Sequence, residues 1–259
     1  MNELLNAAWA KNDVIIGTWL KIPSLFTVEA TVQAGFDFVV VDNEHSYMSD
    51  EWVYQAAAIA QANGVAVVLR AAEPSGRGIS RLLDLDIDGV IFPQIYSASD
   101  ARQAIDSTLF QPRGRRGVGV TSRAGKWAAI NQDDYMARAE SQLFRSIQFE
   151  TESVFEDLDD ILEIPGISST FLGPSDLSQA LGVKMTDPII AELGRNLAEK
   201  SHAKGLKCGT ALGSVAQIPA AIDIGYDFIM ISNDTSLYNS AVRNLTTQAD
   251  LARQGKSEV

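Results

Sequence analysis

Residues 36–46 read FDFVVVDNEHS, an apolar run with an abrupt polar end. Apart from Asp37, residues 36–41 are apolar, which is typical of a strand buried on both faces of a parallel sheet. Asp42 ends the run, and His45, one of only two histidines, follows it. In α/β folds the residues after such strands carry the chemistry, but Asp and Asn also form ordinary turns. Taken alone, the stretch leaves a catalytic site and a solvated turn about equally open.

Similar apolar runs recur in both directions from this stretch, and they alternate with segments of helical periodicity. They predict strands over residues 14–20, 36–42, 65–70, 89–93, 146–150, 168–173, 206–211 and 228–232. The intervening patterns predict helices over residues 24–34, 50–62, 78–86, 98–109, 132–143, 154–162, from 174, 188–203, 216–224 and 236–253.

Eight strand–helix repeats without a Pro/Ser/Gly-rich linker predict a single α/β domain over residues 1–259. The length of 259 residues is close to the roughly 250 typical of a (β/α)8 TIM barrel, which is the fold we expect. An open doubly wound sheet is the alternative. Such a sheet usually has a glycine fingerprint after its first strand, and residues 21–24 (KIPS) lack one.

Composition narrows the range of partners and compartments. The net charge of −12 argues against a nucleic-acid partner, because nucleic acids are bound through basic surfaces. The single cysteine, Cys208, cannot form an internal disulfide and is typical of a reducing compartment. Residues 1–13 lack a signal-peptide pattern, and no apolar run is long enough to span a membrane. We therefore expect a cytoplasmic protein without a membrane partner, whose last residues, 255–259, are frayed.

Polar side chains follow several of the predicted strands, at the ends that converge on one face of a barrel. They belong to Asp42, His45, Arg70, Gln148, Glu150, Ser175 and Asp176. Gly173 and Pro174 directly precede Ser175 in the turn after the sixth predicted strand. An arginine, a histidine near an acid, and two carboxylates on neighbouring strands are the parts of a metal-assisted carbonyl enzyme.

Glu150 and Asp176 are candidate ligands of Mg²⁺ or Mn²⁺, since these hard cations are often held by two carboxylates, water and substrate. Zn²⁺ is less favoured, because neither the other histidine nor the cysteine falls on this face. Each carboxylate could instead stabilise the N-terminus of a helix. The two together, on neighbouring strands, favour the metal site.

Arg70 and His45 each allow two interpretations. Arg70 ends an apolar strand, so its charge needs a partner, either a substrate carboxylate or a structural ion pair with Asp42 or Glu44. His45 near Asp42 fits a general base whose tautomer is set by an acid, or a surface histidine in a turn. Sequence alone leaves both questions open.

Other reactive residues fit the site less well. A Schiff-base aldolase would need a lysine at a strand end, and Lys207 lies at the start of its strand. We expect structural roles for His202, at a helix end, and for Cys208, inside an apolar strand. The arginine-rich segment 111–123 could cradle an anion, close over the site, or be a solvated surface loop.

These motifs, in this order, resemble the metal-dependent (class II) pyruvate aldolases of the HpcH/HpaI type over nearly the whole chain. The resemblance rests on residues 42–45 (DNEH), Arg70, 82–84 (LLD), 114–119 (GRRGVG), 148–150 (QFE) and 173–177 (GPSDL). It implies a barrel of the phosphoenolpyruvate/pyruvate type whose last helix is exchanged between subunits, in a homohexamer built as a trimer of dimers.

The resemblance also implies roles for the matching residues. A divalent cation (Mg²⁺, Mn²⁺ or Co²⁺) would be held by Glu150 and Asp176. Arg70 would bind pyruvate and its enolate, and His45, oriented by Asp42, would be the base. Asp84 would lie near a neighbouring subunit's site, and the substrate would contact Gln148, Gly173, Pro174, Ser175 and Leu212. The chain departs from the family at Asn43, where Gly is usual, and at Ala71, where Pro is frequent.

We therefore expect reversible aldol cleavage of a 4-hydroxy-2-oxo acid to pyruvate, or a close 2-oxo acid, and an aldehyde, as in the catabolism of aromatic compounds or sugar acids. One alternative is a β-hydroxyacyl-CoA lyase of the citrate lyase β-subunit or malyl-CoA lyase type. Another is a metal-dependent enolpyruvate isomerase or mutase. A non-catalytic binding protein is least favoured, because the base, metal ligands and arginine are all present.

Overall fold

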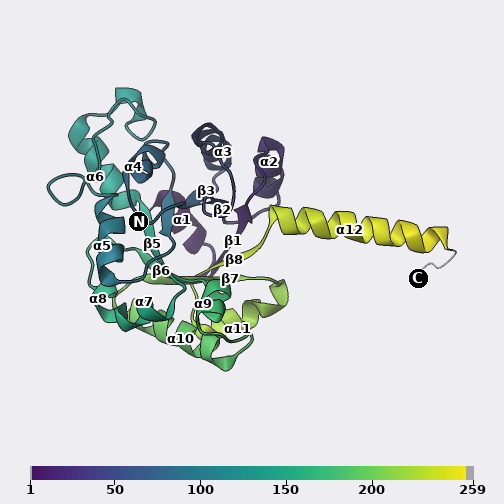
Figure 1. Cartoon of the computed structure of the whole chain (residues 1–259). Helices are drawn as coiled ribbons and strands as arrows, with labels where there is room; N and C mark the ends of the chain where they lie inside the picture. The colour runs from purple at the N-terminus through teal and green to yellow at the C-terminus, as the bar shows by residue number, and fades with distance from the viewer. Residues whose placement is uncertain (1, 255–259) are drawn as a thin grey trace.

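Eight parallel strands close into a barrel in which strands pair in sequence order and β8 pairs with β1 (Figure 1). The structure, a computed structural model, describes residues 2–254, so the tail that we expected to be frayed lies outside it. The strands are β1 (Ile15–Leu20), β2 (Phe38–Asp42), β3 (Ala66–Arg70), β4 (Gly89–Phe92), β5 (Phe144–Phe149), β6 (Ser169–Leu172), β7 (Lys207–Leu212) and β8 (Phe228–Asn233). The predicted TIM barrel is confirmed.

The helices mostly follow the predicted alternation. They are α1 (Glu3–Trp9), α2 (Leu25–Gln33), α3 (Asp50–Ala62), α4 (Arg77–Leu83), α5 (Ala98–Asp106), α6 (Gln132–Gln142), α7 (Glu152–Glu156), α8 (Leu158–Leu162), α9 (Pro174–Ala180), α10 (Pro188–Ala203), α11 (Ile218–Ile224) and α12 (Asp234–Arg253), with short 3-10 turns η1 (Lys126–Ala128) and η2 (Val215–Gln217). α1 stands where no helix is predicted. The single helix predicted over residues 154–162 is wrong, because Asp157 separates α7 from α8 and its carboxylate accepts a hydrogen bond from the Ala98 N–H.

The interior of the barrel is filled by aromatic side chains. The rings of Phe144 and Phe228 meet edge to face with their centroids 5.5 Å apart, and α1 closes the N-terminal end by packing Trp9 against both. Gly17 on β1 faces Phe38, and a Cβ at Gly17 would lie 2.6 Å from that ring. A glycine is therefore needed there for the strands to pack around the ring.

A second layer of core lies between the strands and the helices that surround them. Val39 and Val41 of β2 point into this layer, where α3 contributes the fully buried Val53, Ala56 and Ala60. The small alanines let the helix lie close to the sheet, and apolar burial of this kind supplies most of the stability of the fold.

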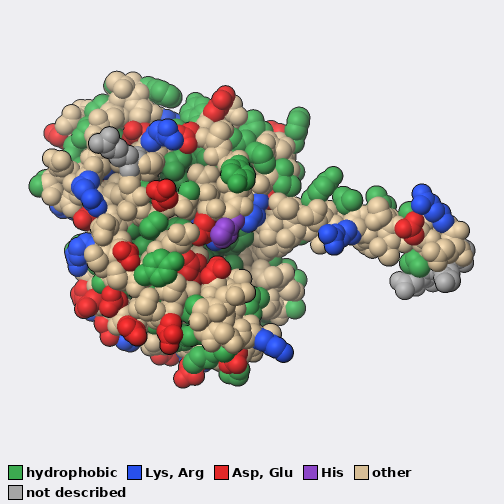
Figure 2. All heavy atoms as spheres, in the orientation of Figure 1, with side chains coloured by type: hydrophobic (Ala, Val, Ile, Leu, Met, Phe, Trp, Pro, Cys, Tyr) green, Lys and Arg blue, Asp and Glu red, His purple; other side chains and the backbone are tan. Residues whose placement is uncertain are grey.

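α12 differs from the other helices because it projects away from the barrel (Figure 1) and buries none of its residues. Apolar side chains lie along it (Figure 2), including Tyr238, Val242 and Leu245 at helical spacing. An exposed apolar helix face suits a partner's surface, and exchange of this helix between subunits stays a prediction. Neither α12 nor any other helix in the described chain is long and apolar enough to cross a membrane.

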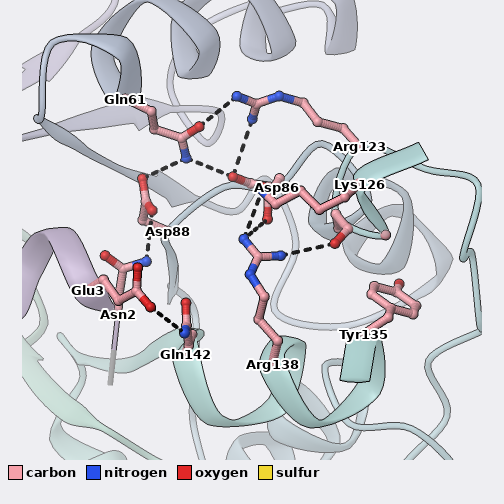
Figure 3. Close-up of polar contacts among 12 residues, drawn as sticks. Asn2, Glu3, Gln61, Asp86, Asp88, Arg123, Lys126, Tyr135, Arg138 and Gln142 are labelled. Atoms are coloured by element: carbon pink, nitrogen blue, oxygen red, sulfur yellow. Dashed lines mark hydrogen bonds and ion pairs between the residues drawn. The ribbon is translucent and has the colours of Figure 1, made fainter. Parts of the chain in front are cut away.

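Part of the arginine-rich region is fixed near the N-terminal ends of the strands by polar contacts (Figure 3). Arg123 donates to the Gln61 side chain at 2.7 Å and to the Leu85 carbonyl at 2.8 Å. Lys126 and Arg138 both form ion pairs with Asp86, at 2.8 and 2.9 Å. Arg123 therefore holds its loop to the barrel, at the end opposite to the C-terminal ends of the strands.

Candidate active site at the C-terminal end of the barrel

A cavity of about 410 Å³ opens at the C-terminal ends of the strands, where TIM barrels carry their active sites. Its volume lies within the range of about 300–1,000 Å³ that is usual for small-molecule sites. Most of the predicted site residues line it, namely Asp42, His45, Arg70, Gln148, Gly173, Pro174, Ser175, Asp176 and Leu212. Residues far apart in sequence are thus brought to one site by the closure of the barrel.

Asp42 ends β2 and is fully buried beside this cavity. Its carboxylate accepts hydrogen bonds from Arg70 Nε at 3.0 Å and Nη2 at 2.8 Å, and Lys21 Nζ lies 2.9 Å away. Burial alone would raise the pKa of Asp42, but the Arg70 and Lys21 cations outweigh it and lower that pKa to about 2. Asp42 is therefore ionised at neutral pH, and one carboxylate anchors two cations.

Arg70 ends β3, and its guanidinium is fixed on several sides. Besides its two bonds to Asp42, it places Nη1 3.0 Å from the Glu44 carboxylate, and its Cζ lies 4.4 Å from the centre of the Trp19 ring. The structural ion pairs that the sequence allowed are confirmed. Two of the five N–H groups of the guanidinium donate to Asp42, and Arg70 also lines the cavity, so other N–H groups remain for a ligand there.

His45 lies at the rim of the cavity with its side chain 55% exposed. Asp42 accepts a hydrogen bond from the main-chain N–H of His45 at 3.2 Å, while the imidazole Nε2 lies 3.7 Å from the carboxylate of Glu44. The expectation that Asp42 orients the imidazole is thereby corrected. Asp42 fixes the turn that carries His45, because its oxygens are already taken by Arg70, Lys21 and main-chain N–H groups.

Glu150 directly follows β5 and is buried. Its carboxylate accepts hydrogen bonds from the Gln94 main chain at 2.6 Å and from the Gln148 side-chain amide. Burial raises the pKa of Glu150, and the charges of Glu44 and Asp176 act in the same direction, while the two hydrogen bonds partly oppose the rise. Negative charge is thus concentrated at this side of the cavity.

The same side of the cavity fits a hard divalent cation. The Oε1 atom of Gln148 is buried without a hydrogen-bond partner, and amide oxygens are ligands that such cations accept. A Cβ at Gly173 would lie 3.0 Å from the Glu150 Cβ and 3.2 Å from the Gln148 amide nitrogen, so glycine keeps this corner open. No group of three or more His, Cys, Asp and Glu suited to a metal occurs in the described residues. The oxygen atoms of Glu150, Asp176 and Gln148 are nonetheless of the kind that Mg²⁺ accepts, and Mg²⁺ usually keeps several water ligands beside one or two carboxylates.

Asp84 is not brought to this cavity. It caps the C-terminus of α4, where its carboxylate accepts hydrogen bonds from the Tyr135 hydroxyl at 3.3 Å and from Arg116 at 3.4 Å. A single chain thus leaves Asp84 outside the site, and its placement near a neighbouring subunit's site stays a prediction.

Several residues of the site were not predicted from the sequence, among them Lys21 and Gln94. Lys21 follows β1 and lines the cavity, and Gln94 follows β4 with a left-handed φ of 56°, uncommon outside glycine. The Gln94 main chain binds Glu150, and its side-chain amide donates to Glu44 at 3.1 Å. Most of the site was predicted by taking the polar residues that follow each predicted strand as candidates. The same rule, applied to the first and fourth predicted strands, selects Lys21 and Gln94.

Comparison with known proteins agrees with this geometry. A family model described as HpcH/HpaI aldolase/citrate lyase matches residues 16–236. The chain belongs to this family. Membership of the HpcH/HpaI family confirms the expected enzyme class, a carbon–carbon lyase of the aldolase type.

Individual relatives of this HpcH/HpaI chain are similar over nearly its whole length. The 2-keto-3-deoxy-L-rhamnonate aldolases of Salmonella paratyphi A and Salmonella enteritidis are 31% and 30% identical, over 94% and 93% of this chain and 93% and 92% of theirs. The structure of an HpcH/HpaI aldolase/citrate lyase family protein from Burkholderia cenocepacia matches with a TM-score of 0.86 at 25% identity, over 96% of this chain and 100% of that chain. A citrate lyase β-subunit from M. tuberculosis, complexed with oxaloacetate and magnesium, matches with a TM-score of 0.55 at 12% identity, over 88% of this chain and 95% of that one, and shares the fold alone.

Proposed function

We propose that this HpcH/HpaI chain is a class II aldolase that reversibly cleaves a 4-hydroxy-2-oxo acid to pyruvate, or a close 2-oxo acid, and an aldehyde. The observation that carries the proposal is one cavity lined by Arg70, His45 and Asp176. The carboxylate of Glu150 is buried next to this cavity, where it contacts Gln148 and lies beside Gly173, which both line it. The names of the Salmonella relatives, aldolases of a 2-keto-3-deoxy acid, support the same substrate class.

Arg70 is proposed to bind the 2-oxo oxygen of the substrate through N–H groups that do not donate to Asp42. Negative charge develops on that oxygen as the enolate of pyruvate forms. Asp42 and Glu44 fix the guanidinium before the substrate arrives, so little reorganisation is needed during the reaction. A preorganised donor of this kind typically contributes about 10²–10³ in rate.

His45 is proposed to take the proton of the 4-hydroxyl group, directly or through water. The C3–C4 bond then breaks, its electron pair forms the enolate, and the new carbonyl leaves as the aldehyde. Protonation at C3 completes pyruvate. The Glu44 carboxylate, 3.7 Å from the imidazole, stabilises the imidazolium that forms.

Glu150 and Asp176 are proposed to hold Mg²⁺, Mn²⁺ or Co²⁺, with Gln148 beside them. When bound, the cation supplies Lewis-acid polarisation of the 2-oxo acid. Gly173, Pro174, Ser175 and Leu212, which line the cavity, are expected to border the substrate.

The enzyme is further proposed to be a homohexamer, a trimer of dimers, that exchanges α12 between subunits and brings Asp84 near a neighbour's site. The absence of buried residues on α12 and the position of Asp84 outside the cavity of its own chain support this arrangement. Light scattering should give the mass of an assembly, and a stable monomer at enzymatic concentrations would contradict the proposal.

Product analysis distinguishes the proposed reaction from its alternatives. A panel of 4-hydroxy-2-oxo acids, β-hydroxyacyl-CoA esters and phosphonates should yield pyruvate from the first class only. Cleavage should stop in EDTA and return when Mg²⁺ or Mn²⁺ is added in excess. Full activity in EDTA would exclude a class II aldolase.

Lys21 needs a separate test, because a lysine in the cavity could in principle form a Schiff base with pyruvate, and only Lys207 was considered from the sequence. Its ammonium lies 2.9 Å from Asp42, an ion pair that a nucleophilic neutral amine would have to give up. Borohydride reduction in the presence of pyruvate should therefore leave the mass of the chain unchanged. A covalent pyruvate adduct on Lys21 would contradict the metal-dependent mechanism.

A further inference from the structure

A second cavity, of about 460 Å³, lies beside the catalytic cavity between α10, β7 and α11. Apolar side chains form most of its wall, including Ile190 and Ala191 from α10 and Ala220 and Ile224 from α11. The catalytic cavity, in contrast, has acidic and basic side chains in its wall, such as those of Arg70 and Asp176. The two spaces therefore differ in the chemistry that they offer a ligand.

The two cavities meet along a common wall. Pro174, Met185 and Leu212 line both of them, together with Ala211 and Gly213. Leu212 is among the residues expected to border the substrate, and Met185 lies in the exposed loop between α9 and α10 with a side chain that adapts to differently shaped ligands. A substrate whose reacting carbons lie near Arg70 can thus extend past Leu212 and Met185 into the second cavity.

Several of the polar groups around the second cavity already form hydrogen bonds within the protein. The Asp187 carboxylate caps α10 by accepting from the Ile189 N–H at 3.1 Å, and the Gln217 side-chain oxygen accepts from the Gly213 and Ser214 N–H groups, both at 3.1 Å. The Thr210 hydroxyl donates to a main-chain carbonyl at 3.2 Å. The cavity therefore offers apolar surface and few free hydrogen-bonding groups to a ligand.

We propose that this second cavity, the tail cavity, binds an apolar chain on the aldehyde part of the substrate. The inference rests on the proposed aldolase function and names the substrate class, namely 4-hydroxy-2-oxo acids whose C4 carries an alkyl or aryl group. Burial of each methylene group in the tail cavity should raise kcat/KM roughly fourfold, because transfer from water to an apolar site favours it by that factor. Polyhydroxylated aldehydes of equal length gain no such contribution, since their hydroxyls would lose water without finding partners.

The test is the aldol addition of pyruvate to acetaldehyde, butanal, hexanal and erythrose, with kcat/KM measured for each aldehyde. We expect a rise from acetaldehyde to hexanal and a lower value for erythrose than for butanal, which has the same number of carbons. Ala191→Phe and Ala220→Phe fill the tail cavity from opposite sides and should each lower the ratio of hexanal to acetaldehyde kcat/KM at least tenfold. Ala203→Phe, at the far end of α10 and outside the cavity, is the matched control and should keep the wild-type ratio.

Exchange of the methyl protons of pyruvate with solvent, measured on each protein, separates the two ways of failing. An enzyme that exchanges these protons but shows no dependence on chain length would overturn the tail cavity and leave the aldolase function standing. An enzyme that exchanges none and adds pyruvate to no aldehyde would overturn the function and the inference with it. If the two cavity-filling variants change the mass of the assembly by light scattering and leave the hexanal ratio at its wild-type value, a neighbouring chain occupies the cavity and the inference is wrong.

Discussion

Asp42 and Asp88 are buried carboxylates at opposite ends of the barrel, and their surroundings differ. Asp42 ends β2 and contacts the Arg70 and Lys21 cations, which lower its pKa to about 2 despite burial. Asp88 directly precedes β4 and accepts hydrogen bonds from neutral donors, such as the Val67 N–H at 2.8 Å. Burial raises the pKa of Asp88, and those hydrogen bonds only partly oppose it.

This difference between Asp42 and Asp88 indicates that the C-terminal end of the barrel binds ligands (the binding end), whereas the N-terminal end stabilises the fold (the structural end). The cations around Asp42 border a cavity of about 410 Å³, so their charge is available to a ligand. The amides of Asn2 and Gln61 close around Asp88 (Figure 3), beside a cavity of about 30 Å³ that has room for little more than ordered water. TIM barrels generally place chemistry at the C-terminal ends of the strands and stability at the other end.

Replacing Arg70 by Ala should have the largest effect on activity. We expect kcat/KM for cleavage to fall about 10³-fold, because the enolate loses its preorganised donor. The matched control is Arg123→Ala at the structural end, which removes the bond to Gln61. That variant should lower the melting temperature and keep kcat/KM within about twofold. Comparable losses of activity in both variants would mean that the two ends do not differ in function.

Asp42→Asn should lower the free energy of unfolding by about 3 kcal/mol at pH 7, because Arg70 and Lys21 lose their buried counter-charge. The pH dependence follows from the lowered pKa of Asp42. Above about pH 4 the ionised carboxylate stabilises the fold by about 2 kcal/mol, and this contribution disappears as the pH falls towards 2. Urea titrations should therefore show the difference between wild type and variant shrinking over that range. A difference that is constant from pH 7 to pH 2 would contradict the ion-paired state of Asp42.

Asp88→Asn should have the opposite dependence on pH. The raised pKa of Asp88 means that the folded chain holds its proton to a higher pH than the unfolded chain does. Its contribution to stability is complete below about pH 4 and is lost as the pH rises through the folded pKa. We expect the variant to be less stable by about 1 kcal/mol at acidic pH, since a donor loses its acceptor, and the difference to shrink as the pH rises. Activity should be unaffected, and a change in kcat/KM would remove the distinction between the two ends.

Among the changes at the binding end, Lys21→Met should lower activity less than Arg70→Ala does. Arg70 still holds the Asp42 carboxylate through two hydrogen bonds, so the site keeps its main donor. We expect kcat/KM to fall less than tenfold with pyruvate exchange retained. Complete loss of both would assign Lys21 a direct part in the chemistry.

The barrel could be predicted because buried parallel strands are continuous apolar runs, and each predicted strand matches an observed one. The site followed from polar residues after those strands, such as Asp42 and Glu150. Other features depend on contacts that the sequence pattern does not contain. The Asp157 carboxylate between α7 and α8 accepts from a distant main-chain N–H. The Asp42 oxygens contact Arg70 at the end of β3 and Lys21 just after β1, while the imidazole of His45 lies near Glu44.

Solvent exchange of the methyl protons of pyruvate, followed by NMR, tests the central claim most directly, because it requires the metal site and Arg70 but no aldehyde. The account predicts exchange with Mg²⁺ or Mn²⁺ present, loss of exchange in EDTA, recovery when the metal is restored, and none in Arg70→Ala. Exchange that persists at the wild-type rate in EDTA, or in Arg70→Ala with metal present, would contradict the assignment of this cavity as a metal-dependent pyruvate site.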